Sequence, residues 1–143
     1  MPMLNRTAVI ACSLLLAISA MGAEPTLDPC ALIPQADVAK IIGEIKEMKT
    51  TEGLRNEKVC DYTNMEGSWL KVSVYSAEHW EMVKISAIEP TDIKGLGEEA
   101  YGAKRGTSRE VFVRQGKLML AVSSTVGAEK TQQIAAAAAK QLP

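Results

Sequence analysis

Two cysteines constrain the fold of this chain more than any other feature. Cys30 stands in Asp-Pro-Cys-Ala-Leu-Ile at 28–33, just before a predicted helix, and Cys60 stands in a predicted strand. The third cysteine, Cys12, lies in an N-terminal segment that an exported protein would lose. An even number of cysteines in an oxidising compartment is typical of structural disulfides. The pair therefore predicts one bond that ties the start of the first helix to the sheet.

Redox chemistry and metal binding are the alternative uses of these cysteines. Redox motifs usually hold their cysteines two residues apart, whereas Cys30 and Cys60 are far apart in the sequence. A zinc site needs more ligands than two cysteines and the single histidine, His79. We therefore favour a structural disulfide, and we expect neither a metal site nor a cofactor.

The first 23 residues are typical of an export signal. Arg6 precedes an apolar run of 13 residues at 8–20, and the small residues Gly22 and Ala23 follow it. A signal-peptide core has this length, whereas a membrane-spanning helix needs about 20 apolar residues. We expect a signal at 1–23, a single mature domain at 24–143 and a periplasmic or secreted location. No later segment is apolar for long enough to predict a transmembrane helix.

The sequence favours neither a lipid anchor nor a nucleic-acid partner. Val-Ile-Ala-Cys at 9–12 loosely imitates a lipobox, but most of the apolar run follows Cys12 instead of preceding it. Leu-Asp-Pro at 27–29 before Cys30 fits no lipidation signal. The formal net charge of the chain is −1, so no general electrostatic attraction draws it to nucleic acid or anionic lipid.

Periodicity and turn residues predict an α+β fold. The predicted helices cover 34–42, 77–87 and 128–141, and the predicted strands cover 45–51, 59–64, 69–75, 98–104, 109–115 and 117–125. The segment at 89–97 is predicted to be a connector because Pro90, Gly95 and Gly97 interrupt it. Short turns favour antiparallel pairing. We expect helices packed on an antiparallel sheet of five to six strands, in the order helix, three strands, helix, three strands, helix.

The clearest strand covers 69–75, and its two faces differ. Leu70, Val72 and Val74 share one face, whereas Trp69, Lys71, Ser73 and Tyr75 share the other. If no helix covers the second face, its two aromatic residues would contact a partner protein or a small ligand. If a helix does cover it, they belong to the core. Three helices are enough to cover one face and part of the other, which favours the core.

Few residues fit a catalytic role. His79 is the only histidine, and Ser76, three residues before it, is better explained as a helix cap. Glu98 and Glu99 are adjacent on a predicted strand, so they point to opposite faces and cannot flank one glycosidic bond. We therefore expect a protein that is not an enzyme.

Basic residues gather at two predicted turns. Lys104, Arg105 and Arg109 surround one turn, and Arg114 and Lys117 surround the next. Charges at hairpin ends usually keep turns solvated and strand edges unpaired, which is the interpretation we favour. The alternative is contact with an acidic partner or with lipid headgroups, and Arg105 and Arg109 are the candidates for contact with a partner.

Three short motifs, in order, resemble those of a broad group of small bacterial exported proteins and lipoproteins of unknown function. They are Asp-Pro-Cys-Ala-Leu-Ile at 28–33, Cys60-x-Tyr62 and Gly-Leu-Gly-Glu-Glu-Ala-Tyr at 95–101. The resemblance spans most of the mature chain and implies an α+β sandwich similar to the PsbP/Mog1-like proteins. It brings no catalytic residue to this chain.

These observations leave three hypotheses for function. The favoured one is an exported, non-enzymatic binding module of the bacterial envelope, whose target is another envelope protein or a small ligand. Its candidate partner surface comprises Trp69, Lys71, Tyr75, Arg105 and Arg109. The second is an inhibitor or immunity-type protein that blocks an envelope hydrolase. The third is an unrecognised hydrolase, which would need two convergent titratable groups in a polar pocket.

Overall fold

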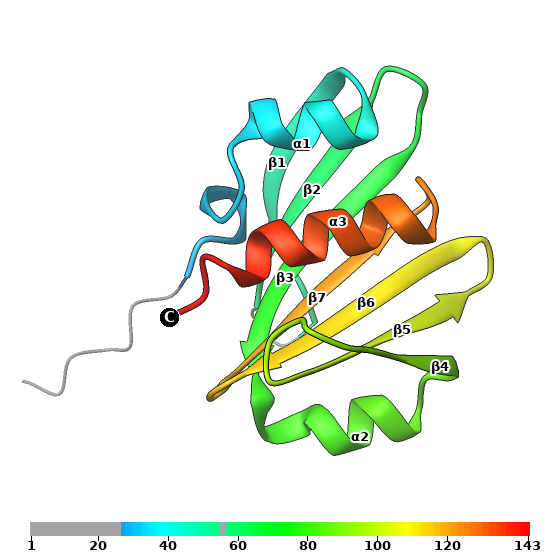
Figure 1. Ribbon diagram of the computed structural model, residues 1–143. Coiled ribbons are helices and arrows are strands. Elements are labelled where there is room, and N and C mark those ends of the chain that lie inside the picture. Colours follow the sequence, from blue (N-terminus) through cyan, green and yellow to red (C-terminus); the bar gives the residue numbers. More distant parts are fainter. Residues whose placement is uncertain (1–26, 55–56) are drawn as a thin grey trace, which may run out of the picture.

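The computed structural model of the chain describes residues 27–54 and 57–143 (Figure 1). Within these residues one antiparallel sheet contains seven strands in the order β1-β2-β3-β7-β6-β5-β4. The strands are β1 (Ile45–Glu52), β2 (Lys58–Asn64), β3 (Trp69–Ser76), β4 (Ile88–Ile93), β5 (Glu99–Arg105), β6 (Ser108–Gln115) and β7 (Leu118–Ser124). The α-helices are α1 (Gln35–Ile42), α2 (Trp80–Ile85) and α3 (Ala128–Ala139), and 3-10 turns cover Pro29–Ala31 and Ala77–His79. The predicted α+β class with an antiparallel sheet is confirmed.

The prediction of five to six strands is wrong, because β4 occupies the segment that was expected to be a connector. β4 lies at the edge of the sheet and pairs with β5, with an irregularity between Ile88 and Thr91. Pro90 lies in that irregularity, and Glu89 beside it has a φ of 50°. A proline cannot donate to a ladder, but an irregular edge strand tolerates it.

The second predicted helix is shorter than expected. The segment predicted as one helix at 77–87 is a 3-10 turn followed by α2, which has only six residues. The predicted cap is confirmed, because Ser76 Oγ accepts a hydrogen bond from Glu78 N at 3.3 Å. A helix this short covers little of a seven-stranded sheet.

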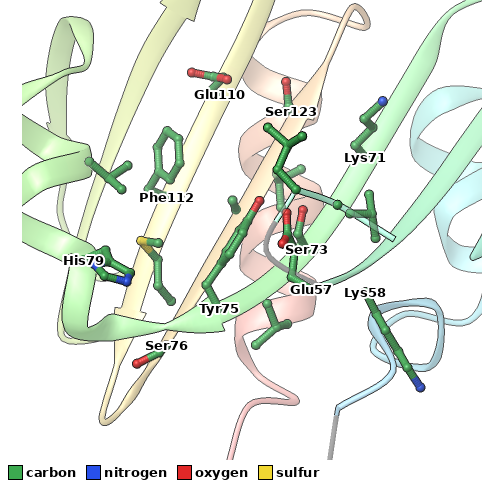
Figure 2. Close-up of a pocket in the computed structure, with 18 of the residues that line it drawn as sticks. Glu57, Lys58, Lys71, Ser73, Tyr75, Ser76, His79, Glu110, Phe112 and Ser123 are labelled. Carbon is green, nitrogen blue, oxygen red and sulfur yellow. The ribbon is translucent and has the colours of Figure 1, made fainter. Parts of the chain in front are cut away.

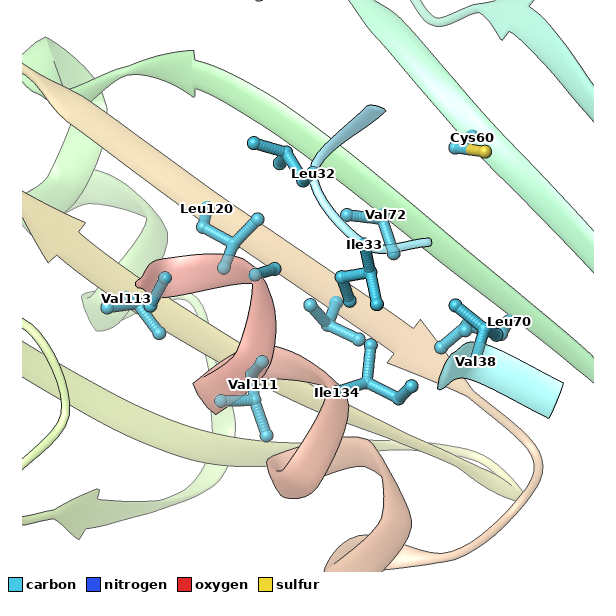
Figure 3. Close-up of a cluster of buried hydrophobic side chains, with 14 of the residues drawn as sticks. Leu32, Ile33, Val38, Cys60, Leu70, Val72, Val111, Val113, Leu120 and Ile134 are labelled. Atoms are coloured by element: carbon cyan, nitrogen blue, oxygen red, sulfur yellow. The ribbon is translucent and has the colours of Figure 1, made fainter. Parts of the chain in front are cut away.

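The first face of the sheet, which carries Leu70 and Val72, is sealed by α1 and α3. Side chains from β3, β6 and β7 pack there against Val38 of α1 and Ile134 of α3, and all are almost fully buried (Figure 3). The strand residues in this layer are Leu70, Val72, Val111, Val113, Leu120 and Val122. On α3, Ala135 and Ala138 are also buried, and their small side chains allow close approach to the sheet.

The predicted disulfide between Cys30 and Cys60 is present. It joins the 3-10 turn Pro29–Ala31 to β2, with a Cα–Cα distance of 5.0 Å. Asp28 caps that turn by accepting a hydrogen bond from Cys30 N at 3.0 Å. The start of the described chain is therefore fastened to the first face of the sheet.

The Gly-Leu-Gly motif has a structural explanation. Gly97 has a φ of 58°, which favours glycine, and a Cβ at this position would lie 2.5 Å from Val113 Cγ1 and 2.7 Å from the Arg114 carbonyl oxygen. Leu96 is buried in the first-face core. The motif therefore lets the chain pass close to β6 before it enters β5.

No helix among the described residues is both long enough and apolar enough to cross a membrane. The predicted export signal at 1–23 lies outside the residues that the structure describes.

Candidate functional site

The second face of the sheet, which carries Lys71 and Ser73, is covered by α2 at one end only. Trp80 of α2 is 2% exposed and packs with Tyr101 and Met119. The Trp80 and Tyr101 rings meet edge to face with centroids 5.2 Å apart, and the Tyr101 and Phe112 rings stack with centroids 5.0 Å apart. An aromatic stack therefore leads from α2 toward the middle of the sheet.

Glu99 of β5 holds α2 on this face. Its carboxylate accepts hydrogen bonds from Trp80 Nε1 at 3.0 Å and from Lys84 Nζ at 2.6 Å, and Arg114 Nη2 lies 3.3 Å away. The hydrogen bond from Lys84 holds the pKa of the Glu99 carboxyl below its ordinary value, and the same bond raises the pKa of the Lys84 ammonium. Burial raises the pKa of Tyr101 to about 12, and the charge of Glu110 adds to the effect.

The rest of the second face forms a groove of about 1000 Å³ (Figure 2). Its walls are α2 and the described residues Gly53, Leu54 and Glu57 between β1 and β2, and β3, β6 and β7 supply its floor. The floor residues are Lys71, Ser73, Tyr75, Glu110, Phe112, Met119, Ala121 and Ser123. Tyr75 and Phe112 are both half-buried, so part of each ring remains open to the groove.

Cross-strand register sorts the floor residues into two rows. The polar row contains Asp61, Lys71, Ser123 and Glu110, which are successive partners on β2, β3, β7 and β6. The adjacent central row contains Val59, Ser73, Ala121, Phe112 and Tyr101 on β2, β3, β7, β6 and β5. The groove is therefore polar along one line and mainly apolar along the next.

The charged groups of the polar row are paired. Lys71 Nζ lies 3.5 Å from Asp61 Oδ1, and Arg105 Nε lies 2.9 Å from Glu110 Oε1. Asp61 also accepts a hydrogen bond from Thr51 Oγ1. Both signs of charge are thus present at the edge of the groove, one base with one acid in each of these two pairs.

The structure brings together three of the predicted partner residues. Lys71, Tyr75 and Arg105 line the groove. Trp69 lies beside it, with its ring centroid 5.9 Å from Lys71 Nζ. The register places Arg109 opposite Ser124, so it shares the parity of the first-face residues and does not join the groove. The second face is therefore neither fully covered nor fully open, which the two alternatives for Trp69 and Tyr75 did not foresee.

Sequence reasoning missed the other half of the groove. Phe112, Ala121 and Ser123 were not among the candidates, although the alternation along 117–125 places Ala121 and Ser123 on one face. The sequence does not reveal that β3 pairs with β7, which begins more than 40 residues further along the chain. His79, exposed at the start of α2, also lines the groove.

Metal ligands do not gather in the part of the chain that the structure describes. No group of three or more His, Cys, Asp or Glu side chains within 27–54 and 57–143 is placed to hold a metal ion.

Comparison with known proteins gives a likeness of fold. No family model matches the chain, and no curated protein matches it. Its structure is similar to the crystal structure of a GTP-binding regulator from Thermotoga maritima, with a TM-score of 0.50 and 10% sequence identity. The alignment covers 80% of this chain and 93% of that chain. At this identity the likeness shows the fold alone.

Proposed function

We propose that this protein is a non-enzymatic binding module of the bacterial envelope and that its target lies in the second-face groove. The observation that carries the proposal is the groove itself, an exposed hollow of about 1000 Å³ on a sheet whose other face is sealed. Ligand sites are concave and mainly apolar, with a few polar groups that fix orientation. The central row supplies the apolar part, and the polar row supplies the orienting groups.

The state of the charged groups supports recognition over catalysis. Lys71 is paired with Asp61, and Arg105 is paired with Glu110. Paired charges fix the shape of a surface, whereas a hydrolase needs two titratable groups that converge beside the substrate, of which His79 would supply one. We therefore place the hydrolase hypothesis last.

The envelope location is part of this proposal. The Cys30–Cys60 disulfide supports it, because such bonds persist in oxidising compartments such as the periplasm. The predicted signal at 1–23 and the resemblance to small exported proteins point the same way. We include the PsbP/Mog1-like relationship in the proposal on the strength of that resemblance.

We do not extend GTP binding from the structural neighbour to this chain. Among the described residues, acidic and basic side chains line the groove in equal number, so they do not supply the excess of positive charge that attracts a triphosphate. The acids are Glu52, Glu57 and Glu110, and the bases are Lys58, Lys71 and Arg105.

Affinity capture from the organism's own envelope, with quantitative mass spectrometry, tests the proposal. Ser123→Arg places a long side chain in the polar row, and Gln132→Arg makes a comparable change on an exposed position of α3, over the opposite face. We expect a partner that the natural protein and Gln132→Arg both retain and that Ser123→Arg loses, with similar melting temperatures for all three. A partner retained equally by Ser123→Arg would place the binding surface elsewhere.

Inhibition of an envelope hydrolase is the second candidate, and the position of Arg105 favours it. This side chain is 76% exposed at the edge of the groove, where it could meet an acidic site on an enzyme. Arg105→Glu should then weaken the captured enzyme complex, whereas Arg109→Glu, outside the groove, should not. Equal binding by both variants would exclude Arg105 as a contact.

A further inference from the structure

The aromatic stack on the second face ends at a ring that the groove leaves partly uncovered. Trp80, Tyr101 and Phe112 follow one another from α2 toward the groove, and Tyr101 and Phe112 stack at an interplanar angle of 21°. Trp80 and Tyr101 are almost fully buried, whereas Phe112 is half-buried and lines the groove. One side of the Phe112 ring is therefore occupied by Tyr101, and the stack stops there.

The positions beyond Phe112 in the central row have small side chains. Phe112 of β6 is opposite Ala121 of β7, and Ala121 is opposite Ser73 of β3. Neighbouring strands are about 4.8 Å apart. Ala121 is only partly buried, whereas Ser73 is 6% exposed, so the opening beside Phe112 lies over Ala121. Tyr75 projects into the groove from β3, on the far side of β7 from Phe112 (Figure 2). The floor therefore has a low point at Ala121 between two aromatic side chains.

We infer that the target is a polypeptide that inserts an aromatic side chain over Ala121, where its ring extends the stack through Phe112. This inference rests on the proposed function and specifies its target. Offset-stacked rings are a preferred arrangement for aromatic pairs, and a half-buried Phe112 offers one free side for it. The polar row, two residues along each strand from the central row, lies where the peptide groups that flank the inserted residue would run.

The charges and the size of the groove favour a polypeptide as the ligand that carries the aromatic ring. The edge carries both signs in neighbouring pairs, Lys71 with Asp61 and Arg105 with Glu110, which complements a chain with side chains of both signs. The polar row crosses four strands, a length of about 14 Å that exceeds one ring. An aromatic anchor in a pocket, surrounded by polar contacts, is the usual arrangement of a protein interface.

Titration of the isotope-labelled protein with N-acetyl-tryptophanamide, followed by NMR, tests the inference. This probe carries an aromatic side chain between two peptide groups, and N-acetyl-leucinamide is the non-aromatic control. We expect saturable shifts centred on the amides of Ser73, Phe112 and Ala121 with the aromatic probe and weaker shifts with leucine. Ala121→Leu fills the opening and should weaken binding at least about tenfold, whereas Ala121→Ser keeps the opening and should change binding less than about twofold.

Phe112→Leu provides a second variant if Ala121→Leu does not fold. It keeps an apolar side chain but removes the ring, and should weaken the aromatic probe about two- to tenfold while leaving the leucine probe unchanged. Equal shifts with both probes, shifts centred outside the groove, or undiminished binding by Ala121→Leu would each overturn the inference. A small aromatic molecule bound to protein purified from the envelope, seen by native mass spectrometry, would overturn the polypeptide source.

Different results would reject the binding module and the aromatic anchor. If capture depends on Ser123 but the groove does not prefer the tryptophan probe, the aromatic anchor is rejected. The proposal of a binding module then still stands. Capture that is unaffected by Ser123→Arg would reject the groove as the binding site of the module.

Discussion

The two faces of the sheet differ in their covering and in the side chains that they present. The first face carries aliphatic residues such as Leu70 and Leu120, which are 0% exposed beneath α1 and α3. The second face carries aromatic, charged and small residues, and the six-residue α2 covers only one end of it. Burial is therefore concentrated on one side of the sheet, and the open groove on the other.

A single strand can serve both faces because neighbouring residues point in opposite directions. On β7, Leu120 and Val122 belong to the first-face core, whereas Ala121 and Ser123 line the groove. Stability and recognition are thus assigned to alternate positions of the same strand. Substitutions a few residues apart should then have very different consequences.

The strongest test of this division compares two positions on β7. Leu120→Ala removes a fully buried side chain beneath α3 and should lower the free energy of unfolding by about 3–5 kcal/mol. Ser123→Ala changes a half-buried residue on the groove side and should alter the free energy by less than about 0.5 kcal/mol. Urea denaturation of both variants measures the difference. Similar losses of unfolding free energy for the two variants would mean that both faces contribute comparably to stability.

The disulfide, which fastens only the first face, should have the next largest effect on stability. It closes a loop with a sequence separation of 30 residues, which gives about 3–4 kcal/mol in the chain-entropy model. A reducing agent should therefore lower the melting temperature of the natural protein. The double variant Cys30→Ala/Cys60→Ala should melt at the lowered temperature with or without the reducing agent.

Reduction of the disulfide should leave binding in the groove unchanged as long as the protein stays folded. Neither Cys30 nor Cys60 lines the groove, so the reduced protein should retain its captured partner well below its melting temperature. Loss of the partner on reduction, with the fold intact, would show that the two faces are coupled.

The first face could be predicted from the sequence because its signals are local. Alternation in 69–75 and 117–125 identified the aliphatic sides of β3 and β7, and an even cysteine count identified the bond between Cys30 and Cys60. The edge strand β4 was missed for a physical reason. Pro90 disrupts an interior strand, but at a sheet edge its missing N–H costs no ladder hydrogen bond.

The groove could be predicted only in part because it depends on which strands are neighbours. Lys71 and Tyr75 were identified from the pattern of β3 alone. Phe112 and Ala121 join them through long-range pairing of β3 with β7 and of β7 with β6. Nothing in the local sequence of β6 marks Phe112 as the end of an aromatic stack, because its partner Tyr101 is on another strand.

The smallest expected effect concerns the attachment of α2, which forms one wall of the groove. Glu99→Gln keeps an acceptor for Trp80 but removes the charge that pairs with Lys84 and Arg114. Ion pairs at partly exposed positions contribute little to stability. The loss of unfolding free energy should therefore be smaller than the losses expected for Leu120→Ala and for removal of the disulfide. Glu98→Gln is the matched control, since that side chain instead accepts a hydrogen bond from Gly116 N.

The pH dependence of this loss separates the charge of Glu99 from its shape. The pKa of Glu99 is lowered in the folded state, so its contribution is present above its unfolded pKa and is lost as the pH falls through the folded value. The pKa of Lys84 is raised, so its contribution is present below its unfolded pKa and is lost as the pH rises through the folded value. The stability gap between the natural protein and Glu99→Gln should thus be widest near neutral pH and should close as the pH falls through the lowered folded pKa of Glu99. The absence of a gap at neutral pH would mean that Glu99 holds α2 through its hydrogen bond with Trp80 alone, because Glu99→Gln keeps that acceptor. A gap that stays constant in acid would mean that the loss does not come from the charge of Glu99.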